Sequence, residues 1–226
     1  MSVPLSSTSV ASAAEQLREL QERIHLLQGR RNREVSYPLL PAFSPLLPDG
    51  LRAGAVYSVE APLSVAMALL AGPSSQGHWC GVAGVPDFGA EAAKGFGISL
   101  ERTVLVPDPG DRWLVTASAL ADVLPLLLVR PPARPGAGDA SRLSSRLRER
   151  GCTLLVLGPW LQAEGVLGVE GSRWDGLGEG HGHLRSHRMN LVWSQRGTRR
   201  RTGIDLAALH ADPTPWGEAT PAGGLP

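Results

Sequence analysis

Six arginines gather near the C-terminal end of the chain, and their spacing suits the binding of anions. They lie between His181 and Arg201, a stretch without a single acidic residue and therefore with a local charge of +6. Guanidinium groups neutralise phosphates, and aromatic rings between them can stack on bases. The stretch fits a nucleic acid, an acidic protein surface, or a solvated basic loop without a specific partner. We assign to this candidate binding site Arg185, Arg188, Trp193, Arg196, Arg199, Arg200 and Arg201.

Other residues that could do chemistry lack the neighbours that a metal site or a catalytic centre requires. His181, His183 and His187 have no cysteine nearby and lie around a glycine-rich turn, so we expect no metal ion. Cys80 and Cys152 each lie inside an apolar run, which favours buried, reduced thiols over reactive ones. The chain has a single lysine among 22 basic residues, which limits any chemistry that requires an ammonium group.

A second candidate surface is an N-terminal helix with a narrow apolar seam. Ser12 and Glu15 have the spacing of a capping box, and Gly29 is a typical stop, so the pattern predicts a helix over 12–29. Its apolar residues repeat at spacings of three and four, with charged residues around them. Such a seam either packs on its own domain or docks a partner helix. The seam consists of Leu17, Leu20, Ile24 and Leu27.

Composition limits the class of protein that positions these residues. The chain has 226 residues, of which 42% are hydrophobic, and this suits one globular domain with short tails. Its 27 glycines follow no collagen-like period, and its hydrophobic fraction is too high for a wholly disordered chain. The longest apolar stretches are shorter than the roughly 18 residues that a membrane helix needs. Because the N-terminus also lacks a secretory pattern, we expect a cytoplasmic protein without a membrane partner.

The order of apolar runs and helical segments predicts an α/β fold with a mostly parallel sheet flanked by helices. The expected strands are Ala55 to Val59, His78 to Val85, Arg102 to Val106, Leu126 to Arg130 and Thr153 to Gly158. The expected helices are Leu63 to Ala71, Ala90 to Phe96, Asp111 to Val123, and Ala140 to Arg150 with Asp139 as its cap. After Pro159, alternating segments at Gly165 to Glu170 and Arg188 to Ser194 predict antiparallel strands that extend the sheet.

These elements give the expected division of the chain. Residues 1–11 are expected to be disordered, and 12–29 form the N-terminal helix. The proline-rich segment 30–54 reads as an extended linker. Residues 55–206 form the core, and 207–226, rich in proline, glycine and threonine, form a disordered tail.

Several segments of the core resemble known families. Leu47 to Tyr57, with the sequence LPDGLRAGAVY, resembles the segment that leads into the first strand and the phosphate loop of RecA-type ATPases. Phe96 to Arg102 resembles the Leu-Gly-Val-Asp segment of the same proteins. More narrowly, Trp79 to Gly89, Ser172 to Gly178 and Gly180 to Leu184 are similar to the actinobacterial ImuA-prime family. Its members are accessory proteins of the mutasome formed by ImuB and an error-prone polymerase. The resemblance implies a RecA-like fold.

Aligned on this resemblance, the nucleotide site is degenerate. A phosphate loop needs glycines and a lysine so that amides and an ammonium group surround the phosphates. The corresponding segment contains neither, whereas Pro62 removes an amide donor, Glu60 adds negative charge, and Ser64 remains without the lysine before it. Arg130 takes the place of the aspartate that helps to hold magnesium, and Val85 that of the glutamate that orients water. We therefore expect a pseudo-ATPase without a cofactor.

The resemblance implies an adaptor that acts in translesion synthesis during the SOS response to DNA damage. Its expected partner is the ImuB-type Y-family homologue, and through it an error-prone polymerase and the sliding clamp. RecA and DNA are further candidate partners, the former on fold analogy alone. Two alternatives stay open: a nucleotide-dependent RecA-like ATPase or recombinase, and a stand-alone module that binds single-stranded DNA.

Overall fold

A computed structural model of the chain describes residues 35–176 and 186–210. The chain divides into two compact units, Met1–Val35 and Ser36–Pro226, and the fold reported below is that of the second. The predicted N-terminal helix and its seam of Leu17, Leu20, Ile24 and Leu27 lie outside the described residues, as do 211–226 of the predicted tail.

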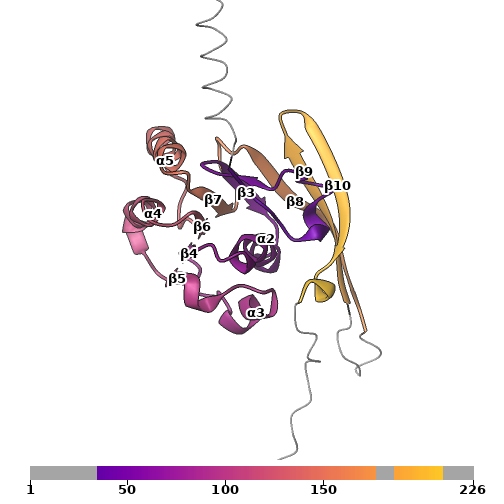
Figure 1. Cartoon of the computed structure of the whole chain (residues 1–226). Helices are drawn as coiled ribbons and strands as arrows, with labels where there is room; N and C mark the ends of the chain where they lie inside the picture. The colour runs from indigo at the N-terminus through magenta and orange to yellow at the C-terminus, as the bar shows by residue number, and fades with distance from the viewer. Residues whose placement is uncertain (1–34, 177–185, 211–226) are drawn as a thin grey trace, which may run out of the picture. The chain divides into compact units, whose positions relative to one another are not determined.

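The second unit is a mixed α/β fold built on an eight-stranded sheet, which confirms the predicted class (Figure 1). The strand order across the sheet is β10-β9-β8-β3-β7-β6-β4-β5. Strands β3 to β8 are parallel to one another, whereas β9 pairs in antiparallel fashion with both β8 and β10. The parallel strands are β3 Val56–Glu60, β4 Cys80–Ala83, β5 Thr103–Val106, β6 Leu126–Val129, β7 Thr153–Leu157 and β8 Gly165–Asp175.

Helices cover both faces of the parallel strands. Helices α2 (Leu63–Ser75) and α3 (Ala90–Gly95) lie on one side, and α4 (Trp113–Ala121) and α5 (Ala137–Arg150) lie on the other (Figure 1). Each of the five predicted parallel strands is present, with ends within two residues of those expected. The cap predicted at Asp139 is wrong, because α5 begins at Ala137 and Asp139 lies in its first turn, 2.5 Å from Arg142.

Helix α2 continues beyond the predicted end at Ala71 and is buried on all sides. Every residue from Val65 to Ser74 is buried, and the helix contains no charged residue. A helix that is apolar all round must be covered on every face. The glycine and proline at positions 72 and 73, which follow the predicted end, lie inside the last turns.

The proline-rich segment before the sheet is part of the core in its described portion, residues 36–54, and so differs from the linker predicted over 30–54. It forms the short ribbon of β1 (Ser36–Tyr37) and β2 (Leu51–Arg52) and the 3-10 turn η1 (Pro41–Phe43). Phe43 and Leu46 are completely buried in the cluster that surrounds α2. The proline-rich segment therefore covers α2.

At the sheet edge opposite β5, β9 (Ser186–Gln195) and β10 (Thr198–Asp205) form a long hairpin, and β9 also pairs with β8. Strand β8 pairs with β3 only as far as Gly168, opposite Glu60, and then continues to Asp175 (Figure 1). The three strands therefore extend beyond the parallel part of the sheet as an arm. A short 3-10 turn, η4 (Ala207–Leu209), follows β10 at the start of the predicted tail. None of the described helices has the length and apolar character required to cross a membrane.

The burial of Phe43 predicts that residues 36–54 contribute directly to stability. Phe43→Ala should lower the free energy of unfolding by about 3–5 kcal/mol, because it removes a large ring from a closed core. Val35→Ala, at an exposed position beside the same segment, should change it by less than about 0.5 kcal/mol. Denaturant unfolding of both variants measures the difference. Equal, small effects would show that the segment does not belong to the core.

Both cysteines are free and buried, and burial raises the pKa of each thiol, Cys80 and Cys152, to about 12. At pH 8 only about one native molecule in 10,000 then carries either thiolate, so reaction with a disulfide reagent should be slow. Unfolded thiols ionise near pH 8.5, so native stability should fall as pH rises from about 9 towards 12.

A thiol titration at pH 8, with and without denaturant, measures this protection. We expect two reactive thiols only after unfolding, whereas a thiol placed on the surface by Ser141→Cys should react at once. Rapid labelling of the native wild-type chain would contradict the expected burial.

Candidate functional site

Open α/β sheets usually bind ligands beyond the carboxyl ends of their parallel strands, and here that edge is short and closed at β3. Only Ala61 and Pro62 connect β3 to α2. Pro62 is the residue before the helix and has no N–H group, and no side chain caps the first turn. Glu60 and Pro62 are exposed and Ser64 is half-buried. A connection of two residues cannot surround a phosphate group with backbone amides.

Hydrogen bonds tie the end of β3 to the end of β7. The buried Ser58 hydroxyl donates to the carbonyl of Gly158 at 2.5 Å and accepts the backbone N–H of Trp160 at 3.2 Å. The Gly158 N–H donates to the Val59 carbonyl at 3.0 Å. These contacts use the polar groups between the two strand ends for structure, and they hold the neighbouring strands together where a nucleotide would enter a RecA-type core.

The next two strands end at an ion pair instead of a pair of carboxylates. Arg130, directly after β6, binds Asp87 with both terminal guanidinium nitrogens, the longer contact being 3.2 Å. Hydrogen bonding from Arg130 lowers the pKa of Asp87. Val85, two residues after β4, is 2% exposed and contributes only to the core. This edge therefore presents one neutralised pair and no free carboxylate at either predicted catalytic position.

The arginine cluster is divided between the two faces of the arm. Arg199 and Arg201 reach Glu170 of β8, at 2.5 and 3.0 Å, and Arg196 lies 3.4 Å from Glu164. Arg200 instead donates to the carbonyl of Leu46 at 3.1 Å, which ties β10 to the segment over α2. Arg185 lies outside the described residues.

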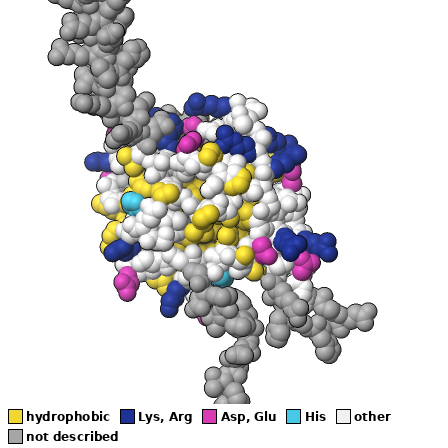
Figure 2. Space-filling model, turned by 45° about the vertical axis from the view of Figure 1, so that its right-hand side comes forward, with side chains coloured by type: hydrophobic (Ala, Val, Ile, Leu, Met, Phe, Trp, Pro, Cys, Tyr) yellow, Lys and Arg dark blue, Asp and Glu magenta, His cyan; other side chains and the backbone are white. Residues whose placement is uncertain are grey.

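The local charge of +6 counted along the sequence is thus partly balanced in space. Glu164 and Glu170 come from β8 and its start, about 30 residues before the arginines that they bind. Figure 2 shows the same pattern on one face of the molecule, where several arginine side chains adjoin acidic ones around a hydrophobic centre. Sequence reasoning missed both glutamates, because no local signal indicates which strands become neighbours.

Trp193 was assigned to base stacking, and this assignment is wrong. The residue is 2% exposed, and its indole ring packs against Tyr57 at a centroid distance of 5.6 Å. A Cβ atom at Gly165 would lie 2.2 Å from the ring, so this glycine is required for the tryptophan to fit. Alternation along β9 could have indicated the burial, because Met189 and Leu191 point to the same side.

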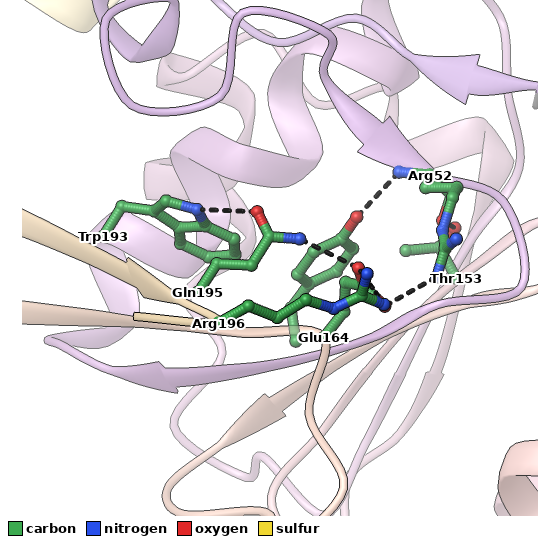
Figure 3. A network of polar contacts seen from close by, with 7 residues as sticks. Arg52, Thr153, Glu164, Trp193, Gln195 and Arg196 are labelled. Carbon is green, nitrogen blue, oxygen red and sulfur yellow. Dashed lines mark hydrogen bonds and ion pairs between the residues drawn. The ribbon is translucent and has the colours of Figure 1, made fainter. Parts of the chain in front are cut away.

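Glu164 is the centre of a polar network at the amino end of β3 and β8 (Figure 3). Its carboxylate accepts hydrogen bonds from Arg52 at 2.6 Å and from the amide of Gln195 at 2.8 Å. The Gln195 side-chain oxygen in turn accepts the indole N–H of Trp193 at 3.4 Å. With 17% of its side chain exposed, Glu164 holds the ribbon, the start of β8 and the end of β9 together.

A hollow of about 620 Å³ opens beside this network, where the arm meets the loop before β8. Glu164 and Val166 line it from one side, and Ser194, Arg196 and Arg199 line it from the other. Two guanidinium groups and one carboxylate therefore border it. The hollow lies at the amino end of β3, whereas the predicted nucleotide site lies at its carboxyl end, so the two are separate.

Among the described residues, no group of three or more histidine, cysteine, aspartate or glutamate side chains is arranged to hold a metal ion. His181 and His183 lie outside the described ranges. His187 stacks on Trp174 with ring centroids 3.4 Å apart and shares a hydrogen bond of 2.8 Å with the Ser172 hydroxyl. Burial lowers its pKa, so the neutral ring is favoured in the folded chain.

The Glu164 network predicts a measurable loss of stability when its charge is removed. Glu164→Gln keeps the shape of the side chain but weakens charge-assisted bonds to two arginines, so unfolding should become easier by about 1–3 kcal/mol. Glu91→Gln, at an exposed position on α3, is the matched control and should have almost no effect. Thermal or denaturant unfolding distinguishes them, and two indistinguishable curves would show that the network does not stabilise the fold.

Comparison with known proteins gives a family but no characterised relative. No curated protein matches the chain significantly. A family model described as the MT3502 N-terminal domain matches residues 45–162. The matched residues run from the end of the proline-rich segment to the loop before β8, and they include the predicted nucleotide-site positions. This match covers half of the chain, and the protein therefore belongs to the MT3502 N-terminal domain family.

Proposed function

We propose that this chain is a non-catalytic RecA-fold adaptor that assembles a translesion-synthesis mutasome in the DNA-damage response. The observation that carries the proposal is the two-residue connection between β3 and α2. The transfer of a phosphoryl group depends on backbone amides, a lysine and a metal-binding carboxylate that together stabilise the developing charge. The chain lacks all three at this edge. Pro62 has no amide N–H, residues 58–65 include no lysine, and Arg130 stands where the carboxylate would be.

The architecture supports the RecA-like part of the proposal. A mostly parallel sheet flanked by helices, with the first core strand β3 in its interior, suits a RecA-like core. The segments similar to the ImuA-prime family include the strand β4 and its following loop, where Asp87 pairs with Arg130. On this basis the partner is an ImuB-type Y-family homologue, which in turn brings the error-prone polymerase and the sliding clamp.

A binding role also suits the distribution of polar groups. The parallel sheet uses its polar side chains internally, as in the bonds between Ser58 and Gly158, whereas the arm presents arginines such as Arg196, which is 79% exposed. An adaptor needs such accessible groups on a rigid scaffold and needs no reactive centre.

Titration with a fluorescent ATP analogue in the presence of magnesium tests the loss of catalysis. We expect no saturable binding at millimolar nucleotide and no phosphate release. Micromolar affinity together with magnesium-dependent hydrolysis would establish the ATPase alternative and overturn the proposal.

Co-expression with the ImuB-type homologue of the same organism tests the adaptor role. The two proteins should co-purify as a complex, and this complex should persist in Pro62→Ala, because the degenerate site is not part of the interface. Failure of the wild-type chain to bind, combined with tight binding of single-stranded DNA that Arg199→Ala and Arg201→Ala together abolish, would favour the stand-alone DNA-binding module.

A further inference from the structure

One face of the arm is uncovered in the described part of the chain. Leu167, Leu191 and Ile204 point from β8, β9 and β10 into the core around α2. Their neighbours point the opposite way, where α4 and α5 cover the parallel strands but no described helix covers the arm. We call this side of β8, β9 and β10 the open face. Two rows of paired residues form its middle: Gly168, Val192 and Arg201, followed by Gly171, Asn190 and Gly203.

At one end of the open face two arginines lie side by side, near the carboxylates of Asp175 and Asp205. Arg173 and Arg188 lie directly opposite each other on β8 and β9, an arrangement of like charges that disfavours the strand pair. Arg173, 82% exposed, reaches Asp175 at 3.1 Å, whereas Arg188 has no carboxylate partner among the described residues. The carboxylate opposite Arg188 on β10, that of Asp205, accepts the backbone N–H groups of His187 and Ala207. Arg188 is therefore available to an external anion.

At the other end of the open face, arginines outnumber carboxylates. Arg199 and Arg201 share the single carboxylate of Glu170, and both guanidinium groups are more than half exposed. Arg199 also borders the hollow beside the Glu164 network. Each guanidinium group offers five N–H donors in a fork that matches a carboxylate. Because the two groups share one carboxylate, most of these donors stay available for hydrogen bonds to a ligand. Groups that would complement both ends of the face are acidic.

Between the two ends, glycines and Asn190 lie around Val192, which is only 5% exposed. The exposed amide of Asn190 lies between Gly171 and Gly203, 3.6 Å from the position of a Cβ atom at either residue. It has no hydrogen-bond partner among the described residues. An amide flanked by bare backbone can both donate to and accept from the backbone of an extended chain.

Packing does not require the glycines at 168 and 203. Neither has a positive φ angle, a Cβ atom at Gly168 would contact nothing within 4 Å, and one at Gly203 would make only the ordinary contact with Asn190. Glycine inside a strand costs stability and is typical where another backbone approaches closely. This contrasts with Gly165, which the ring of Trp193 requires.

We propose that the open face holds an extended, acidic segment of a partner protein. Its backbone lies over the glycines and hydrogen-bonds to Asn190, and its carboxylates pair with Arg173 and Arg188 at one end and with Arg199 at the other. The described residues of the face include no aromatic side chain on which a base could stack. A peptide therefore fits better than single-stranded DNA. The inference rests on the adaptor function and names the chemistry of its partner.

Filling the face tests this inference without removing any charge. Gly168→Val places a branched side chain in open space and Gly203→Val places one in ordinary contact with Asn190. Both favour the strand conformation, so the fold should be kept or slightly stabilised. The full chain and both variants are used to select from a phage-displayed library of random peptides. Peptides that the wild-type chain enriches should be rich in aspartate and glutamate and should bind each variant about tenfold more weakly or worse.

Two controls separate shape from charge. Gly138→Ala adds a methyl group in equally open space on α5 and should bind the peptides as the wild type does. Arg188→Glu should abolish binding, whereas Arg142→Glu, which changes an arginine on α5 that is 80% exposed, should not. Selection of no peptide, of peptides without an acidic excess, or of peptides that bind the valine variants equally would overturn the inference. Binding of an oligothymidylate probe that is lost in both valine variants would overturn it in favour of DNA.

Co-purification with the ImuB-type homologue distinguishes this inference from the adaptor function. A wild-type complex that Gly168→Val disrupts supports both. A wild-type complex that survives in Gly168→Val and Gly203→Val refutes the open face as the docking site and leaves the adaptor function standing. Absence of a complex with the wild-type chain refutes the adaptor function, whatever the peptides show.

Discussion

The uncharged helix α2 imposes the main constraint on this fold, because all of its faces must be buried. The sheet and α3 cover part of it, and the segment 36–48 closes the remainder. At Gly72 this segment passes so close that a Cβ atom would lie 2.6 Å from the Pro38 carbonyl oxygen and 2.8 Å from the Leu39 Cα atom. Any side chain at position 72 would push the segment away. The proline-rich residues are therefore a lid on the helix that the sheet needs for its own stability.

The same burial explains why the usual ligand edge is closed. Helix α2 follows β3 after only Ala61 and Pro62 and contacts β7, and Ser58 binds the end of β7 beside this connection. A phosphate loop needs a longer, glycine-rich connection whose amides face outward. The same few residues after β3 can either pack closely or form a phosphate-binding loop. In this chain they pack closely. The proposed binding role is then left to parts of the molecule outside α2.

Local sequence signals were sufficient for the parallel sheet, since short apolar runs alternate with helical segments, and β4 and β6 are fully buried. They failed where the outcome depends on distant partners. Prolines at 38, 41, 45 and 48 indicate an extended path in any context, and nothing local shows that the path crosses α2. The cluster that includes Arg199 appeared unpaired for the same reason, because Glu170 enters from β8. In both cases the outcome depends on contacts between residues that are far apart in the sequence.

Strand alternation divides the arginines of β10 into two functions. Arg200 points towards the core side and binds the Leu46 carbonyl, so it fastens the edge strand to the lid over α2. Arg199 and Arg201, one residue to either side, point to the open face. Charges on an edge strand also discourage pairing with other sheets, a role that needs no ligand. That role does not account for Arg173 and Arg188, which oppose each other on interior strands of the arm. An acidic partner segment placed between them would relieve this repulsion, so the proposed docking site includes a pair inside the sheet as well as the cluster at its edge.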